Sequence, residues 1–255
     1  TGDTVREAAK NLQGAPGLDG LRGASRKRWL LSFGTVSDGL RAAVAAVASL
    51  CANSVLKGEE RGILRSFLDS SLMPLDKCPG VRPIGVGTIW RRLLAKTALV
   101  SAGPSIERAL GPNQLCGGLR AGIEGAVHAV RHEWEDHKED PSFGSLLLDA
   151  DNAFNRVASA VMLTNVRDRL PCLARFAWNC YSDVAGMCVR GKDGRGEWLT
   201  AIEGVTQGDP AAMVLYGIAL LPLINRLEEK YPSVLHTWYA DDAAATGNLN
   251  ELRDL

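Results

Sequence analysis

The 255-residue sequence predicts an α+β fold. Several stretches repeat apolar residues at helical spacing, and short apolar runs bounded by Gly, Pro or Asp predict strands. From residue 143 onward the predicted order is β-α-β-β-α-β, the split βαβ (ferredoxin-like) arrangement of an antiparallel sheet with helices on one face. With 46% hydrophobic residues, the chain is long enough for a core and for two subdomains.

The first part of the chain is predicted to be mostly helical. Glycine-rich residues 1–35 are the exception, and we expect a loop there with a basic cluster, Arg26-Lys27-Arg28. The segment CPGVRPIGVG predicts turn, short strand and turn, because its two prolines exclude helix. The predicted helices are residues 36–56, 90–102 and 122–138.

From residue 143 the segments are shorter and strands are more frequent. FGSLLLD is an apolar strand that ends on Asp149, a helix follows at 156–169, and MCVRGKDGRGEWLTAI predicts two strands around a turn. In TQGDPAAMVLYG, Asp209 can cap a helix whose first residue is Pro210. SVLHTWYADDAAATG then predicts a strand, an acidic turn and a second strand.

The net charge is zero, but its two signs are unevenly placed. Residues 1–130 carry 17 Lys and Arg against 10 Asp and Glu, whereas residues 131–255 carry 12 against 19. This distribution suits a protein that binds phosphates in one place and metal ions in another, although chance segregation on a solvated surface gives the same pattern.

Targeting signals and cysteine motifs are also informative. No apolar run is expected to reach transmembrane length, and the N-terminus lacks the pattern of a signal peptide. The six cysteines contain no CxxC pair, so we expect reduced thiols and an intracellular protein, nuclear or cytoplasmic.

Three carboxylates stand out. Asp149 ends one predicted strand and Asp241-Asp242 ends another, 92 residues later in the sequence. If the two strands are neighbours, these carboxylates meet at one end of a sheet, where they would suit Mg²⁺ ions. The alternative is an ordinary solvated turn, since Asp is a favoured turn residue.

Four segments in order carry a family resemblance: VRPIGV at 81–86, DADNAF at 149–154, TQGDP at 206–210 and YADD at 239–242. Together they resemble the reverse transcriptase family, most closely the enzymes of eukaryotic retroelements. The resemblance covers roughly residues 75–247. It implies a right-hand polymerase, with an N-terminal basic segment and fingers in 1–142 and the palm core in 143–255. Residues 157–206 are assigned either to the palm or back to the fingers, and a thumb is absent.

The resemblance implies roles for single residues. Asp149 and Asp241 would bind two Mg²⁺ (or Mn²⁺) ions, Asp242 would make a weaker or outer contact, and Ala150 would contribute its carbonyl oxygen. Asp151 is left unassigned, as a solvated acidic residue. The substrate-binding set would be Arg82 and Lys77 for the triphosphate, Phe154 as a steric gate under the sugar, Gln207 and Gly208 as the pocket wall, and Tyr239 near the primer end.

The function implied is RNA-directed DNA synthesis, with an RNA template, a DNA primer and dNTPs as partners, no membrane, and other domains of the same polyprotein. The alternatives are an inactive retroelement relic, a non-catalytic nucleic-acid-binding module, or an RNA-dependent RNA polymerase, which Phe154 disfavours. Arg91, Arg92 and Lys96 are left either as template contacts or as a solvated helix face. Because family members continue into a further palm segment and a thumb, we expect this fragment alone to show little or no activity.

Overall fold

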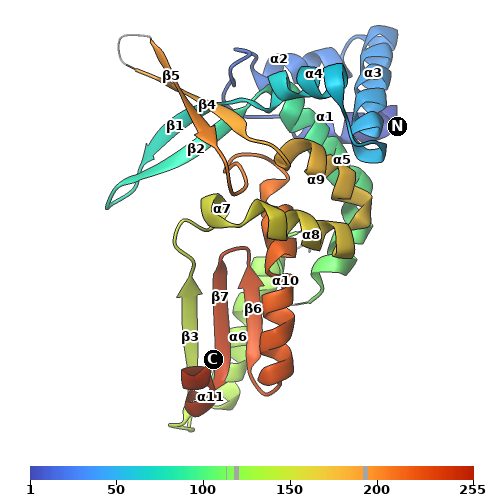
Figure 1. Cartoon of the computed structure of the whole chain (residues 1–255). Coiled ribbons are helices and arrows are strands. Elements are labelled where there is room, and N and C mark those ends of the chain that lie inside the picture. The colour runs from blue at the N-terminus through green and yellow to red at the C-terminus, as the bar shows by residue number, and fades with distance from the viewer. Residues whose placement is uncertain (113, 118–120, 192–194) are drawn as a thin grey trace.

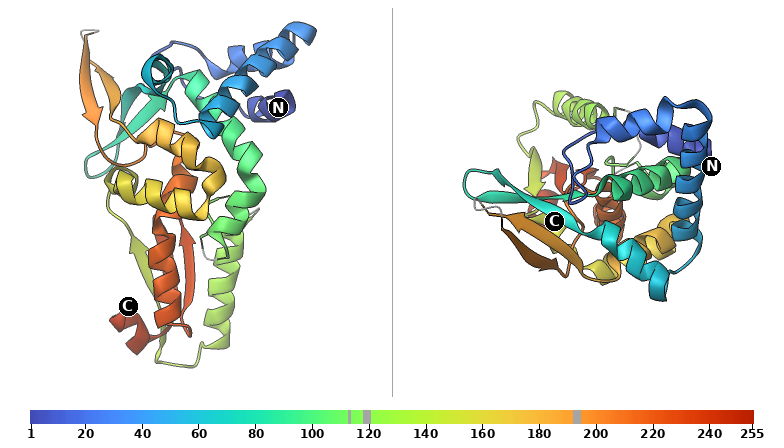
Figure 2. Two further views of the ribbon diagram at one scale, coloured as in Figure 1. Left: turned by 45° about the vertical axis from the view of Figure 1, so that its right-hand side comes forward. Right: turned by 90° about the horizontal axis from the view of Figure 1, so that it is seen from above.

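In the computed structural model, which describes residues 1–112, 114–117, 121–191 and 195–255, helices and strands form two lobes placed end to end (Figure 1). The N-terminus lies in the upper lobe and the C-terminus in the lower one, and the left view of Figure 2 shows the same arrangement. The predicted α+β class is confirmed.

The helices of the upper lobe are α1 (Gly2–Lys10), α2 (Gly23–Leu31), α3 (Gly34–Asn53), α4 (Gly58–Leu68), α5 (Ile89–Leu110) and α9 (Pro171–Tyr181). The remaining helices are α6 (Gly122–Asp136), α7 (Ala153–Arg156), α8 (Ser159–Arg169), α10 (Ala212–Lys230) and α11 (Leu249–Asp254). The strands are β1 (Ser70–Asp76), β2 (Val81–Gly87), β3 (Phe143–Asp149), β4 (Ala185–Arg190), β5 (Gly196–Ala201), β6 (Leu235–Tyr239) and β7 (Asp242–Asn248).

The loop prediction for residues 1–35 is wrong over α1 and α2. The side chain of Thr1 caps α1 by accepting a hydrogen bond from the backbone N–H of Thr4, and the helix buries Val5 against the core. In the predicted basic cluster, Arg26 is buried with its guanidinium 3.3 Å from the centre of the Trp29 ring. The cluster is therefore not a uniform phosphate-binding surface.

The upper sheet has the strand order β2-β1-β4-β5. β1 is antiparallel to β2, β4 is parallel to β1, and β5 is antiparallel to β4. The two strands predicted around GKDG therefore exist, but they belong to the upper sheet, where β4 pairs with β1 and β5 pairs with β4. The linear order of elements had suggested that they join the lower sheet. That order does not determine strand partners, and the second edge of β1 is available to β4. The predicted turn itself, at Lys192–Gly194, lies outside the described residues.

The lower sheet has the order β3-β7-β6, with both pairs antiparallel. α10 covers one face, where Ile224 packs with Trp238 and Ala243. α6 contacts the opposite face through Trp134, whose Nε1 donates a hydrogen bond to Ser145 Oγ at 2.9 Å. Ser145 pairs with Thr246 on β7, three residues from Ala243, and side chains alternate along a strand, so the two residues of β7 point to opposite faces.

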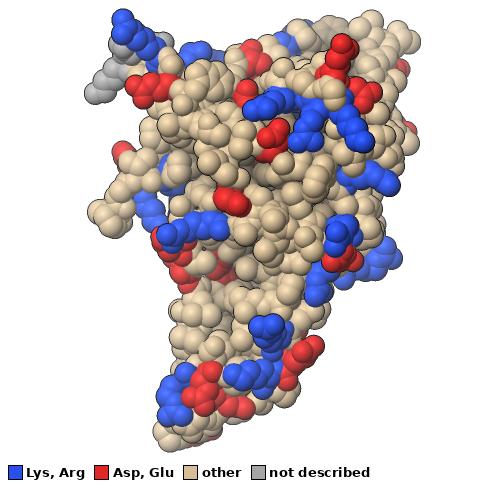
Figure 3. Space-filling model, in the orientation of Figure 1, with Lys and Arg blue, Asp and Glu red and all other residues tan. Residues whose placement is uncertain are grey.

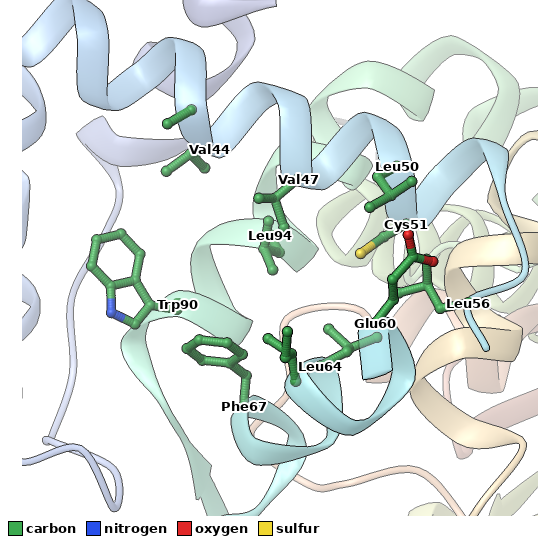
Figure 4. Close-up of a pocket in the computed structure, with 12 residues that line it drawn as sticks. Val44, Val47, Leu50, Cys51, Leu56, Glu60, Leu64, Phe67, Trp90 and Leu94 are labelled. Carbon is green, nitrogen blue, oxygen red and sulfur yellow. The ribbon is translucent and has the colours of Figure 1, made fainter. Parts of the chain in front are cut away.

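The largest hydrophobic core cluster joins α1, α3, α5, α8, α9 and α10. Since α10 lies on the lower sheet and also enters this core, it ties the two lobes together (Figures 1 and 2). An apolar pocket of about 470 Å³ opens between α3, α4 and α5 (Figure 4). Its labelled lining includes Trp90, Phe67 and Leu94, with Glu60 as an acidic side chain at its rim.

The prediction that no run reaches transmembrane length is wrong for α3. Of the described helices, α3 (Gly34–Asn53) has the length and mean hydropathy, 1.3, that would allow it to cross a membrane, and 22% of it is buried. Alanines raise its hydropathy without adding large side chains. The feature is weak evidence for a membrane span, because core helices and signal sequences share it.

Candidate active site

The three carboxylates singled out in the sequence lie at one end of the lower sheet. Asp149, the last residue of β3, is the cross-strand partner of Asp242, the first residue of β7. Asp242 in turn pairs with Tyr239 on β6, so Ala240 and Asp241 form the turn between those strands. The strand that ends at the acidic pair, β6, is not a neighbour of β3, because β7 lies between them. The carboxylates still come together, since β7 begins with Asp242 and pairs with β3 at Asp149.

The turn has an unusual backbone. Ala240 has a φ of 55°, in the left-handed region, and its side chain is buried. This conformation costs a non-glycine residue about 1–2 kcal/mol. It directs Asp241 into a cleft that Asp149 and Arg82 also line, while Asp242 stays on the strand.

Electrostatics reflect this convergence. Burial raises the pKa of the Asp241 carboxyl above its ordinary value, the negative charges of Asp242 and Asp149 raise it further, and Arg82 opposes them. Arg82 does not cancel these effects, since the pKa of Asp241 stays raised, so an added cation beside this carboxylate would be stabilised.

The cleft has a volume of about 600 Å³ and lies between the β1–β2 hairpin, the end of β3, α7 and the acidic turn. On the face shown in Figure 3, acidic and basic side chains lie close together between the two lobes. The predicted residues that line it are Lys77, Arg82, Asp149, Ala150, Phe154, Gln207 and Asp241. Tyr239 and Asp242 line a neighbouring groove on the sheet face, which Asp149 also borders.

Gly208 lies where β2 meets the loop before α10. Its φ is 115°, and a Cβ at this position would lie 2.5 Å from the carbonyl oxygen of Gly85. The backbone N–H of Gly85 donates to the carbonyl oxygen of Gln207 at 2.8 Å. Both features expected of this glycine, a positive φ and a close backbone approach, are present. They fix Gln207 beside the strand that carries Arg82.

Asp209 anchors the same loop from inside. Its Oδ1 accepts a hydrogen bond from the backbone N–H of Ala211, close to the predicted capping role, although α10 begins two residues later than predicted. Its Oδ2 accepts from Arg91 Nη2 at 2.8 Å and from the Tyr181 hydroxyl at 2.7 Å. The loop is thereby tied to α5 and α9 of the upper lobe.

Arg91 and Arg92 neither lie on a solvated helix face nor are placed to contact a template, so both alternatives left open for them are wrong. The Arg91 side chain is only 3% exposed, and burial would lower its pKa, but the charge of Asp209 more than offsets this and raises the pKa. Arg92 is also buried and donates to the backbone carbonyls of Gln13 and Ala15. Both arginines hold the fold together and are not available to a template.

Phe154 is half-buried on α7, and its ring stacks on Tyr216 of α10 with centroids 4.9 Å apart. Burial, and then the charge of Asp241, raise the pKa of Tyr216 to about 12. The Tyr216 hydroxyl is therefore protonated at neutral pH, and its ring gives Phe154 a fixed support at the cleft wall.

The donors suit Mg²⁺ that arrives with substrate. Among the described residues, no group of three or more His, Cys, Asp or Glu side chains is close enough to hold a metal ion by itself. Mg²⁺ is usually bound by one or two carboxylates together with substrate phosphates and water. Asp149 and Asp241 can provide the carboxylates, and Ala150 can add its carbonyl oxygen. Asp151, left unassigned, forms an exposed ion pair with Arg156.

Two residues at the site were missed in the sequence. Tyr216 lies in an apolar helical run where an aromatic residue indicates only core. Gln114 lies in GPNQLCGG, interpreted as a chain break, yet its amide bonds to the Ala240 peptide. A glutamine between two glycine-rich turns carries no signal of its own, so neither role could be found without the tertiary structure.

Comparison with known proteins supports the resemblance. No family model matches the chain. It is 28% identical over 250 residues to the retrotransposable element SLACS 132 kDa protein of Trypanosoma brucei gambiense, which covers 94% of this chain and 19% of that protein. The chain thus spans about a fifth of the curated relative that it matches.

Solved structures share the fold. Telomerase from Candida albicans, in complex with a TWJ fragment of telomeric RNA, aligns with a TM-score of 0.54 at 9% identity, over 87% of this chain and 44% of that one. Apo telomerase from Candida tropicalis aligns with a TM-score of 0.53 at 13% identity, over 87% and 45%. The fold is therefore that of a right-hand polymerase, and the two kinds of similarity together support a reverse-transcriptase-like retroelement family.

Proposed function

We propose that this chain forms the fingers and palm of an RNA-directed DNA polymerase of a retroelement, which extends a DNA primer on an RNA template with dNTPs. One observation carries the proposal: Asp149, Asp241 and Arg82 line one cleft, and the charges of Asp149 and Arg82 both act on the Asp241 carboxyl. Carboxylates and a guanidinium in one cleft suit a nucleoside triphosphate with its cations.

The residues of the cleft divide the work. Asp149, Asp241 and the Ala150 carbonyl would hold two Mg²⁺ or Mn²⁺ ions, with Asp242 as an outer contact. When bound, these ions would promote attack by the primer 3′-hydroxyl and stabilise the leaving pyrophosphate. The forked donors of Arg82, assisted by Lys77, would bind the triphosphate oxygens.

The other lining residues would select and orient the substrates. Phe154, supported by Tyr216, would leave no room for a 2′-hydroxyl and so favour deoxynucleotides. Gln207, held against β2 by the Gly208 turn, would form the pocket wall. Tyr239 lies in the groove beside the carboxylates, where a primer end would reach Asp149.

The test is primer extension by the intact protein that contains this chain. We expect Mg²⁺-dependent extension of a DNA primer on an RNA template, abolished by Asp241→Ala. The matched control is Asp151→Ala, which removes an exposed, ion-paired carboxylate of the same cleft and should retain activity. Equal extension by Asp241→Ala would refute the proposal, and binding of RNA without any extension would favour a non-catalytic module.

A further inference from the structure

The acidic turn has a partner outside its own hairpin. Gln114 is 1% exposed, and among the described residues both hydrogen bonds of its side-chain amide go to Ala240. Its Oε1 accepts from the Ala240 N–H at 2.9 Å, and its Nε2 donates to the Ala240 carbonyl at 3.4 Å. The amide therefore satisfies both backbone groups of a buried residue that has no strand partner of its own.

The segment that carries Gln114 is itself fixed. The backbone N–H of Leu115 donates to the carbonyl oxygen of Trp238 at 2.7 Å, so this segment runs beside β6. On its other side, a Cβ at Gly217 of α10 would lie 2.7 Å from Cys116 Sγ and 3.2 Å from Gln114 Cγ. Gln114 is thus wedged between α10 and the turn, with little freedom to move.

We propose that Gln114 is a positioning residue, which holds the Ala240 peptide in its left-handed conformation and thereby fixes Asp241 in the cleft. The inference rests on the proposed function, since it concerns the binding of cations by Asp241. Alanine disfavours this conformation, and the two hydrogen bonds offset that preference. Without them the turn samples other conformations, and cation affinity falls in proportion to the competent fraction.

The test uses Gln114→Met in the intact protein, because methionine has similar volume and makes neither hydrogen bond. We expect the dissociation constant for Mn²⁺, measured by electron paramagnetic resonance, to rise about tenfold, as when the competent fraction falls to a tenth. Hydrogen exchange of the Ala240 amide should become faster. Adding Ala240→Gly should recover Mn²⁺ affinity, since glycine adopts positive φ without strain.

Asn179 provides the matched control. It is a buried amide that accepts from the backbone N–H of Leu56 and donates to the carbonyls of Cys51 and Ser54, within the upper lobe. Asn179→Leu should lower stability and leave Mn²⁺ affinity unchanged. An equal loss of affinity in this variant would mean that general destabilisation, and not the turn, is responsible.

Three further results would overturn the proposal: a Mn²⁺ dissociation constant of Gln114→Met within twofold of wild type, a rapidly exchanging Ala240 amide in the wild type, or no recovery with Ala240→Gly. If Gln114→Met does not fold, Gln114→Asn, whose shorter side chain withdraws the amide, must show the same loss. Asp241→Asn separates the two levels of argument. If Asp241→Asn binds Mn²⁺ as the wild type does, the proposed function is refuted. If Asp241→Asn loses Mn²⁺ binding but Gln114→Met binds normally, only the role of Gln114 is refuted.

Discussion

Replacing Arg91 by methionine should be among the most destabilising single changes in this chain. Arg91 and Asp209 each expose only 3% of their side chains, and Arg91 donates to Asp209 Oδ2 through both Nε and Nη2. Removing the guanidinium leaves a buried carboxylate whose remaining donors, among the described residues, are the Tyr181 hydroxyl and the Ala211 N–H. Breaking a buried pair in this way costs about 3–5 kcal/mol.

Urea unfolding followed by circular dichroism measures that loss. The exposed pair of Arg65 and Asp183 offers the control, because Arg65→Met should cost less than about 1 kcal/mol. Adding Asp209→Asn to Arg91→Met should restore part of the stability, since it removes the unpaired charge. A cost below about 1 kcal/mol for Arg91→Met, or a double variant whose cost is simply the sum of the two single ones, would refute the argument.

Three further predictions concern the carboxylates, the sugar gate and pH. Without metal, Asp241→Asn should be at least as stable as wild type, because it removes a carboxylate repelled by its neighbours. We expect Mg²⁺ to raise the melting temperature of the wild type but not of this variant, and a lower metal-free melting temperature of the variant would contradict the argument. Phe154→Ala should increase ribonucleotide incorporation by the intact protein in a competition assay, and unchanged sugar selectivity would remove the gate. Burial lowers the pKa of His236 below its ordinary value of about 6.5, so its contribution to stability is present above that pH and lost as pH falls. The free energy of unfolding should therefore drop between pH 7 and 5, and more weakly in His236→Leu; equal slopes would show that another group titrates.

The sequence predicted the parts of the site that depend on local signals. An Asp at the end of an apolar run, and an Asp pair in the turn of a hairpin, indicated which residues end their strands. The order of the four motifs then indicated that those strand ends belong together. The structure does bring Asp149 and Asp241 to one cleft, but it places β7 between the two strands that end in carboxylates, which the sequence did not predict. The positive φ of Gly208 agrees with the turn expected there.

What the sequence did not predict depends on contacts between distant segments. Arg91 and Asp209 are separated by 118 residues, and Gln114 and Ala240 by 126. No periodicity connects such pairs. Arginine is seldom fully buried, so a surface role was the reasonable expectation for Arg91, and only the packing of α5 against the loop reverses it. The strand pairing of β4 with β1 was missed for the same reason.

The two buried hydrogen-bonding networks hold different sides of one cleft. Arg91 and Asp209 fix the Gln207 wall to the upper lobe, whereas Gln114 fixes the Asp241 turn to the lower one. Their effects should therefore separate. Loss of the Arg91 pair lowers global stability and leaves the carboxylates where they are, so Mn²⁺ affinity measured under folded conditions should be retained. Loss of the Gln114 amide should reduce Mn²⁺ affinity even under conditions where the variant is fully folded. If both variants changed stability and Mn²⁺ affinity in the same ratio, the cleft would be a single cooperative unit and the separate roles argued for the two networks would be wrong.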